Sequence, residues 1–231
     1  MQVLVWIMWL ASATVYADWT NWQSQIIAKQ QTLPGWCGPS KATAMMDLIY
    51  KTKPQLCVEI GVFGGSSLFP TACALQYLNC GQVYGIDSWS HTDCCIGYKI
   101  GDPDYEWWSQ VPLMQIHHDL ENLLKKHHLD TYCRLLCLSS QDACSYFTDG
   151  SIDILHIDGN HSEASTLQDV QMFFPKVKSG GYIWLNDTDR VTAAKAVWYL
   201  CLHADLDEGR SAFAKRESNG TVSCYLLFKK P

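Results

Sequence analysis

The sequence has few charged residues, and no run of Lys or Arg in it is longer than two residues. Charged residues make up 17% of the 231 residues, and the formal net charge is −6. Nucleic-acid-binding surfaces need clustered positive charge, so this composition argues against DNA or RNA as a partner. The chain also lacks internal repeats, low-complexity tracts and long linkers. With 48% hydrophobic residues, it has enough apolar material for the core of one domain or two small ones.

No Lys or Arg precedes the apolar stretch at residues 3–13, although Val15-Tyr16-Ala17 looks like the cleavage site of a secretory signal. The stretch is too short for a typical transmembrane helix. It is therefore either a signal or anchor, or a hydrophobic helix that packs on the domain or on a partner subunit. We divide the chain into an N-terminal apolar segment with its lead-in, residues 1–37, and a single domain, residues 38–231.

The eleven cysteines are an odd number, so they cannot all pair within one chain. Four of them lie in apolar runs typical of buried strands: Cys57, Cys133, Cys137 and Cys224. Free cysteine in such places behaves as a small hydrophobe, which favours a reduced, cytoplasmic protein. The vicinal pair Cys94-Cys95 lies near His91 and Asp93, but no second pair completes a structural zinc site.

Apolar runs typical of buried strands alternate with helix-length segments. Strands are expected at residues 55–60, 82–86, 132–138, 152–157 and 182–185, with two more at 211–216 and 222–229. Helices are expected at residues 39–51, 66–79, 104–127, 162–174 and 191–203, with a break near Pro112. This order predicts a Rossmann-like, doubly wound α/β fold with a mostly parallel, seven-stranded sheet. The last two strands are expected to form an antiparallel hairpin at its C-terminal edge.

Two of the expected strands are followed by an aspartate. Asp158 comes directly after the strand at 152–157, and Asp187 comes after the strand at 182–185. Ligands of an open parallel sheet bind outside the carboxyl ends of its strands, so we expect both carboxylates in one site. His161 stands three residues beyond Asp158. The combination indicates a metal-assisted reaction site.

The turn after the first strand is not the dinucleotide fingerprint G-x-G-x-x-G, because residues 61–66 read G-x-x-G-G-S. Its glycines allow the backbone to approach a ligand at a helix N-terminus. Glu59, just inside the strand, would repel a pyrophosphate but suits a cationic cofactor. Asp87, at the end of the second strand, is placed like the acidic residue that accepts from ribose hydroxyls. These features favour S-adenosylmethionine over NAD.

Four short runs resemble motifs of the class I S-adenosylmethionine-dependent methyltransferases. V-E-I-G-V-F-G-G-S-S at residues 58–67 looks like the first motif, and G-I-D-S-W at 85–89 looks like the second. S-S-Q-D at 139–142 is similar to the segment that covers adenine in catechol-type O-methyltransferases. H-I-D-G-N-H-S at 156–162 is similar to a run of small bacterial enzymes that include macrolide-sugar and rhamnosyl O-methyltransferases. The resemblance covers about residues 40–198 and implies O-methylation of a small molecule, a sugar or a phenol.

The resemblance also implies how S-adenosylmethionine is bound. Its methionine end would lie against Glu59, Gly61 and Ser67, its ribose against Asp87, and its adenine against Ser140 and Gln141. For the two adenine residues, an ordinary helix cap is the alternative interpretation.

In metal-dependent relatives, Mg²⁺ is held by an Asp after the fourth strand and by two further residues after the fifth, and it lowers the pKa of the acceptor hydroxyl. Asp158 and Asp187 match two of these positions. The third falls on Thr188, a departure from the usual carboxylate or amide, with Asp189 as the substitute. His161 matches the catalytic base, a task for which histidine is suited at neutral pH.

The segment 88–108 is rich in aromatic and histidine side chains: Trp89, His91, Tyr98, Tyr105, Trp107 and Trp108. They are expected either to form a lid over the acceptor or to pack the following helix onto the sheet. We expect a small-molecule acceptor, no nucleic-acid or membrane partner, and a monomer or a homo-oligomer. An exported or non-catalytic binding domain on the same scaffold is the alternative, and other chemistry in the same pocket is a third interpretation.

Overall fold

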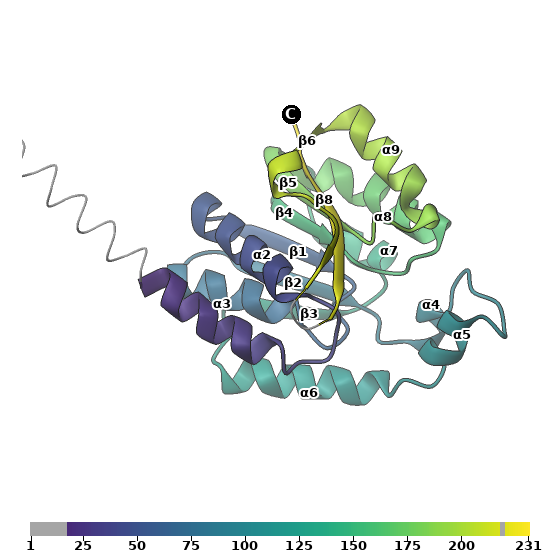
Figure 1. The fold of residues 1–231 in the computed structure, drawn as a ribbon, viewed down its shortest axis with the longest axis horizontal. Coiled ribbons are helices and arrows are strands. Elements are labelled where there is room, and N and C mark those ends of the chain that lie inside the picture. Colours follow the sequence, from purple (N-terminus) through teal and green to yellow (C-terminus); the bar gives the residue numbers. More distant parts are fainter. Residues whose placement is uncertain (1–17, 218–219) are drawn as a thin grey trace, which may run out of the picture.

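One eight-stranded sheet runs through the part of the protein that the computed structural model describes, residues 18–217 and 220–231 (Figure 1). The strands are β1 (Leu56–Ile60), β2 (Gln82–Asp87), β3 (Cys133–Cys137), β4 (Ile152–Ile157), β5 (Val177–Asn186), β6 (Asp205–Leu206), β7 (Ala212–Arg216) and β8 (Val222–Lys229). Their order is β3-β2-β1-β4-β5-β8-β6, and β7 pairs with β8. Strands β1 to β5 are parallel, and β8 runs antiparallel to its neighbours. The predicted mostly parallel sheet with an antiparallel C-terminal hairpin is confirmed.

The sheet differs from the prediction in two details. It has eight strands rather than seven, because the short strand β6 pairs with the end of β8. Strand β5 also begins at Val177, before the predicted start at residue 182. Gly180-Gly181 is typical of a turn, but in the structure it forms an irregularity inside β5, where the register against β4 shifts. Gly180 has a φ of +77°, which glycine adopts without steric cost.

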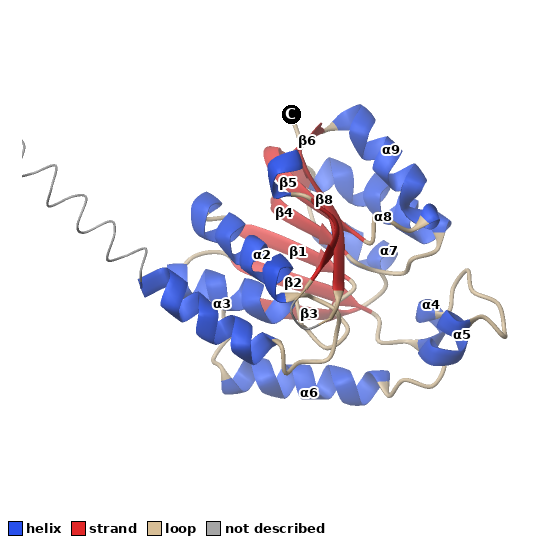
Figure 2. Cartoon of the chain, in the orientation of Figure 1, coloured by secondary structure: helices blue, strands red, loops and turns tan. Residues whose placement is uncertain are grey.

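Helices cover both faces of the sheet (Figure 2). One face carries α2 (Pro39–Thr52), α3 (Leu68–Leu78) and α6 (Leu113–Lys126), and the other carries α7 (Ser140–Ala143), α8 (Glu163–Phe173) and α9 (Ala194–His203). The short helices α4 (His91–Cys94) and α5 (Pro103–Trp108) lie in the long connection between β2 and α6. Single 3₁₀ turns lie at Cys144–Tyr146, Phe174–Lys176, Val191–Ala193 and Glu208–Arg210. This coverage explains why β1 and β4 are buried at consecutive positions, because neither face meets water.

The break predicted near Pro112 separates two helices. Helix α5 ends at Trp108, and Pro112 is the N-cap residue of α6. Proline suits this place because it lacks an N–H that a helix interior would need. Helix α6 then buries Leu113, Leu120 and Leu124, which lie along one side at helical spacing. That apolar side fixes α6 against the sheet layer and holds the connection from β2 over the strand ends.

Residues 18–30 are helical and join the hydrophobic core on the α2–α3 side of the sheet. Trp19 is fully buried there, and its indole N–H donates to Oδ1 of Asp47 at 3.1 Å. The predicted signal-like or packing segment, residues 1–17, lies outside the described residues. Within the described ranges, no helix is long and apolar enough to cross a membrane.

All eleven cysteines are free thiols. Cys57, Cys133 and Cys224 are buried, as their apolar surroundings in the sequence indicate. Cys137 is exposed instead, because it ends β3, the edge strand of the sheet. Burial raises the pKa of the Cys133 and Cys57 thiols, so they stay protonated and serve as small apolar side chains.

Candidate active site

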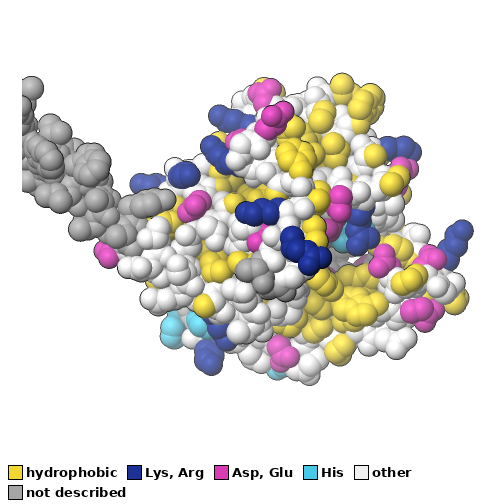
Figure 3. All heavy atoms as spheres, viewed as in Figure 1, with side chains coloured by type: hydrophobic (Ala, Val, Ile, Leu, Met, Phe, Trp, Pro, Cys, Tyr) yellow, Lys and Arg dark blue, Asp and Glu magenta, His cyan; other side chains and the backbone are white. Residues whose placement is uncertain are grey.

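A pocket of about 620 Å³ opens at the carboxyl ends of the parallel strands. Parallel strands all end at the same edge of a sheet, so the topology brings the loops after β1, β2, β4 and β5 together. Eight of the predicted site residues line this pocket: Gly61, Ser67, Asp87, Ser140, Gln141, Asp158, His161 and Asp187. Hydrophobic side chains gather on the face of the molecule beside the α4–α5 segment (Figure 3).

The glycine turn after β1 lies directly against the loop after β4. Gly61 has a φ of +84°, and a Cβ added there would overlap the backbone carbonyl of Asp158. Its own N–H donates to the carbonyl of Ile86 at 2.9 Å. Only glycine allows this close approach, because any side chain would push the two loops apart. Gly61 therefore sets the distance between the predicted cofactor turn and the predicted reaction residue Asp158.

Asp87 holds the glycine turn through its carboxylate. Its Oδ2 accepts from the backbone N–H groups of Val62 at 3.0 Å and Phe63 at 2.9 Å, and its Oδ1 accepts from Trp89 at 2.8 Å. Burial raises the pKa of Asp87, although these backbone donors oppose the shift. The residue thus lines the pocket at the place predicted for ribose recognition and also fixes the turn beside it.

Glu59 lies behind the pocket wall rather than in it. It is 1% exposed, its Oε1 accepts from the Ser67 hydroxyl at 2.7 Å, and its Oε2 lies 3.1 Å from Nδ1 of His156. Ser67 lines the pocket, so Glu59 influences the pocket through the hydrogen bond that it accepts from the Ser67 hydroxyl. Nε2 of His156 in turn lies 3.7 Å from Oδ2 of Asp158. A buried polar chain therefore runs from the glycine turn to the strand end of β4.

Ser140 also lines the pocket, and its hydroxyl donates to Oδ1 of Asp169 at 2.5 Å. Asp169 comes from α8 and is buried, and burial raises the pKa of its carboxyl to about 6. Gln141 lines the pocket beside it, 3.5 Å from the amide of Gln168. The N-cap of α7 is Ser139, so Ser140 and Gln141 are not occupied as helix caps. Asp169 was not predicted, because in the sequence it looks like a polar position on an ordinary amphipathic helix.

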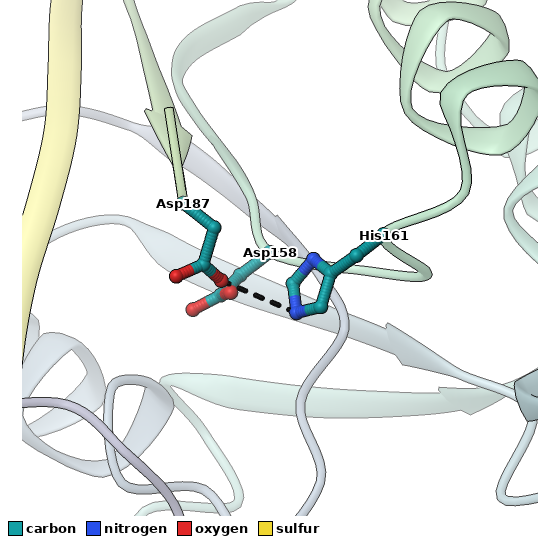
Figure 4. A group of neighbouring side chains, drawn as sticks. All are labelled: Asp158, His161 and Asp187. Carbon is teal, nitrogen blue, oxygen red and sulfur yellow. Dashed lines mark ion pairs between the residues drawn. The ribbon is translucent and has the colours of Figure 1, made fainter. Parts of the chain in front are cut away.

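Asp158, His161 and Asp187 converge in the pocket (Figure 4). Nε2 of His161 lies 3.2 Å from Oδ2 of Asp187, and one ligand atom from each of the three residues lies within 4.8 Å of the others. Asp187 has a φ of +50°, so the backbone after β5 turns sharply to aim this carboxylate. Burial and the neighbouring Asp158 raise the pKa of Asp187, although His161 opposes this. For Asp158, burial is outweighed by Lys41 and His156, which lower its pKa.

Two residues of this site were missed in the sequence. Lys41, in the first turn of α2, is buried, and its Nζ lies 3.0 Å from Oδ2 of Asp158 and 2.8 Å from Oδ1 of Asn186. The amide nitrogen of Asn186 donates to Oδ1 of Asp158 at 2.9 Å and to Oδ2 of Asp187 at 3.1 Å. Asn186 could have been predicted, because it is the last residue of β5 and precedes Asp187. Lys41 could not have been predicted, since nothing near it in the sequence distinguishes it from a solvent-exposed lysine on a helix.

Thr188 and Asp189 do not join the acidic cluster. The Thr188 hydroxyl lies 3.4 Å from the thiol of Cys224 on β8, so it faces the neighbouring strand. Neither residue lines the pocket. Among the His, Cys, Asp and Glu side chains that the structure describes, the group close enough to share a metal ion contains His161 as its third member.

The segment 88–108 divides between core and pocket. Trp89 is buried, and its indole N–H donates to the carbonyl of Phe63 at 3.0 Å. Tyr98, Trp107 and Trp108 line the pocket instead. The structure adds Trp36, whose ring stacks on Phe63 at 5.3 Å and meets Trp107 edge-on at 5.3 Å. An aromatic corner of Trp36, Phe63, Trp107 and Trp108 therefore borders the pocket, built from three separate parts of the chain.

Comparison with known proteins agrees with this geometry. The family model described as a methyltransferase domain matches residues 58–188, more than half of the chain. The uncharacterized protein y4gI of Sinorhizobium fredii (strain NBRC 101917 / NGR234) is 24% identical over 157 residues, which are 66% of this chain and 15% of that protein. The chain thus spans only a small part of that relative's length.

Solved structures of the same fold include three cofactor complexes. The O-methyltransferase from Bacillus cereus in complex with SAH has a TM-score of 0.58 at 12% identity, covering 91% of this chain and 90% of that one. The O-methyltransferase TomG from Streptomyces achromogenes, involved in tomaymycin synthesis and in complex with SAM, has a TM-score of 0.59 at 12% identity, with 90% and 89% covered. Cofactor-bound Rv0187 from MTB has a TM-score of 0.60 at 14% identity, with 91% and 88% covered. The family match shows that the chain belongs to the methyltransferase domain family, and its fold is that of these cofactor-bound methyltransferase structures.

Proposed function

We propose that the protein methylates a hydroxyl group of a small molecule, a sugar or a phenol, with S-adenosylmethionine as the methyl donor. The observation that carries this proposal is a single pocket whose lining combines Ser67, Asp87 and Ser140 with Asp158 and His161. When bound, S-adenosylmethionine supplies a methyl group on a positively charged sulfur. The protein's task is then to hold an acceptor oxygen in line with that group and to exclude water.

The pocket suits S-adenosylmethionine in its charge and in its hydrogen-bonding groups. Asp87 offers a carboxylate for ribose hydroxyls, and the Ser140–Asp169 pair borders the region proposed for adenine. The Lys and Arg side chains that line the pocket are Lys41 and Arg190, and both lie within 4 Å of an aspartate, at Asp158 and Asp104. A cofactor with a phosphate group would need a Lys or Arg that is not already paired with a carboxylate, whereas a cationic cofactor needs none.

We further propose that His161 is the general base. It is partly exposed in the pocket, and Asp187 lies within hydrogen-bonding distance of its Nε2. A neutral imidazole that donates from Nε2 to Asp187 keeps Nδ1 as an acceptor for the proton of the hydroxyl. In this arrangement Asp187 fixes the tautomer of His161, much as a carboxylate does in other acid–base pairs.

Metal assistance is the second part of this proposal. The donor set of Asp158, Asp187 and His161 fits a divalent cation in its spacing, within 4.8 Å. Two carboxylates with an imidazole would suit Mn²⁺ or a similar transition metal, whereas two carboxylates with water suit Mg²⁺ as well as Mn²⁺, because Mg²⁺ prefers oxygen ligands. Such a cation would lower the pKa of the acceptor hydroxyl. Nε2 of His161 cannot serve Asp187 and a metal at once, so we assign the cation to the two carboxylates with water and leave His161 as the base.

Calorimetry and a methyl-transfer assay test the proposal. We expect one S-adenosylmethionine to bind per chain, and Asp87→Ala to weaken binding by about 100-fold, because each hydrogen bond to a charged group contributes about 1.5–3 kcal/mol. Asp149→Ala is the matched control, since Asp149 forms a surface ion pair with Lys176 away from the pocket. Absence of binding to the wild type would rule the proposal out. Binding without transfer to any sugar or phenol would favour the binding-domain alternative.

We also propose an intracellular location, because S-adenosylmethionine is an intracellular cofactor and all eleven cysteines are free thiols. Intact mass of the mature protein tests this. Loss of residues 1–17 together with the mass deficit of linked cysteines would indicate export instead.

A further inference from the structure

Lys41 brings a buried positive charge into the reaction site. Its side chain is 3% exposed, and its ammonium lies 3.0 Å from Oδ2 of Asp158 and 2.8 Å from Oδ1 of Asn186. A buried charge is tolerated only when it is paired and hydrogen-bonded, and these two oxygens supply both conditions. The ammonium is therefore part of the site and not a surface group that happens to reach it.

The Lys41 ammonium lies where a divalent cation bound to Asp158 would have to lie. A metal bound to Oδ2 of Asp158 would lie close to Nζ of Lys41, and the two positive charges would repel each other in a poorly solvated place. The other Asp158 oxygen, Oδ1, already accepts from the amide of Asn186 at 2.9 Å. Both oxygens of Asp158 are thus engaged by groups of the protein itself.

The orientation of the Asn186 amide also fits an ammonium rather than a metal ion. Its amide oxygen faces the Lys41 ammonium, and its amide nitrogen faces Asp158 and Asp187. This is the arrangement that an ammonium requires, because oxygen accepts from Lys41 while nitrogen donates to the carboxylates. A metal held between the two carboxylates would instead favour an amide that presents its oxygen.

We propose that Lys41 is the resident cation of this site, and that a divalent cation binds to Asp158 and Asp187 only by displacing the Lys41 ammonium. The inference rests on the proposed reaction site but not on methyl transfer itself. It means that the chain carries its own positive charge beside the acceptor oxygen, and that its affinity for metal is held down by that charge. Lys41 then decides how far the enzyme depends on metal.

Titration with Mn²⁺, followed by the electron paramagnetic resonance signal of the free ion, tests this inference. Lys41→Met removes the ammonium but keeps a side chain of similar length, and we expect it to bind one Mn²⁺ at least about tenfold more tightly than the wild type, since like charges nearby disfavour a cation. Adding Asp158→Asn to Lys41→Met should abolish that gain. Lys178→Met is the matched control, because Lys178 pairs with Asp153 at 2.7 Å and is absent from the pocket lining. Equal affinities of wild type and Lys41→Met, or binding by neither, would overturn the proposal.

A second measurement uses the wild type and needs no variant to fold. Trace acetylation with detection by mass spectrometry reports how accessible each lysine is, and Lys178, 39% exposed, serves as the internal reference. We expect Lys41 to be protected without metal and its labelling to rise severalfold when Mn²⁺ saturates the site. Unchanged protection of Lys41 with Mn²⁺ bound would show that the metal binds without displacing it. Neither measurement requires methyl transfer, so a failed assay of activity leaves this inference open to its own test.

Discussion

Nε2 of His161 lies 3.2 Å from Oδ2 of Asp187, although the two residues come from loops that follow different strands, β4 and β5. Burial and the nearby Asp158 raise the pKa of Asp187, so its carboxylate gains from a donor, and His161 is placed to be one. This contact defines which nitrogen of His161 is left to accept a proton. It therefore links the geometry of the strand ends to the proposed acid–base chemistry.

We expect His161→Ala to lower kcat by about 10²–10⁴-fold, the usual contribution of a general base, without changing the affinity for S-adenosylmethionine. His118→Ala is the control, because His118 lies exposed on α6, 3.8 Å from Glu121, and is absent from the pocket lining. A variant that keeps the wild-type rate would show that His161 is not the base.

Gly61→Ala tests the close approach of the two loops. The added Cβ would overlap the Asp158 carbonyl and would also hold a residue with a side chain at a φ of +84°. We expect a loss in the free energy of unfolding of about 3 kcal/mol or more, together with loss of cofactor binding. Gly150→Ala separates the two causes, since Gly150 has a φ of +66° with nothing within 4 Å of the added atom. It should cost only about 1 kcal/mol, the penalty of the left-handed conformation. Equal costs in urea unfolding would refute the overlap.

The order of strands and helices could be predicted because it rests on local patterns. Asp158 and Asp187 follow buried strands directly, and the edge at which parallel strands end brings them together whatever the loops do. His161 was found through its distance from Asp158 along the chain. The resemblance to metal-dependent methyltransferases placed Thr188 with them, but the turn at Asp187 directs Thr188 towards Cys224 on β8. A side-chain direction after a positive φ does not follow from spacing alone.

The contacts of Lys41 and Trp36 with the pocket could not be predicted from the sequence. Both come from before β1 and reach the pocket because residues 18–52 pack on one face of the sheet, which brings Lys41 to Asp158 and Trp36 to Phe63. Contacts over such separations leave no local periodic signal. Asp169 was missed for another reason: a polar residue on a helix reads as solvated, and only the packing of α8 against Ser140 buries it.

The raised pKa of Asp169 predicts that the stability of the protein depends on pH. Burial raises its pKa from 3.8 to about 6 in the folded protein, so ionisation there costs about 3 kcal/mol at pH 7, by the relation of 1.36 kcal/mol for each pKa unit. The cost is absent below pH 3.8, where the carboxyl is protonated in both states, and it develops as the pH rises to 6. Asp169→Asn keeps an oxygen that accepts from Ser140 and removes the charge. It should therefore stabilise the protein by up to about 3 kcal/mol at pH 7 and by much less near pH 4.

Urea unfolding of wild type and Asp169→Asn at several pH values measures this difference. Asp149→Asn, at an exposed carboxylate paired with Lys176, controls for the general effect of removing a negative charge. A gain for Asp169→Asn that is the same at pH 4.5 and pH 7.5 would mean that the buried carboxyl does not titrate between these values.

Trp107 tests whether the aromatic corner binds the acceptor. Trp36 and Trp107 are 58% and 42% exposed where they border the pocket, and their rings contact each other, so they form the kind of contiguous apolar patch that marks a ligand-binding groove. We expect Trp107→Ala to raise KM for a phenol or sugar acceptor by about tenfold, since one aromatic contact contributes about 0.5–1.5 kcal/mol beyond burial of its area. The affinity for S-adenosylmethionine should change less than KM, because Trp107 touches the glycine turn through the Phe63 ring and lies outside the residues assigned to the cofactor. Trp198→Ala is the matched control, since Trp198 is 67% exposed on α9 and does not line the pocket. If both variants leave KM unchanged, the corner packs the α5 segment and the acceptor lies elsewhere in the pocket.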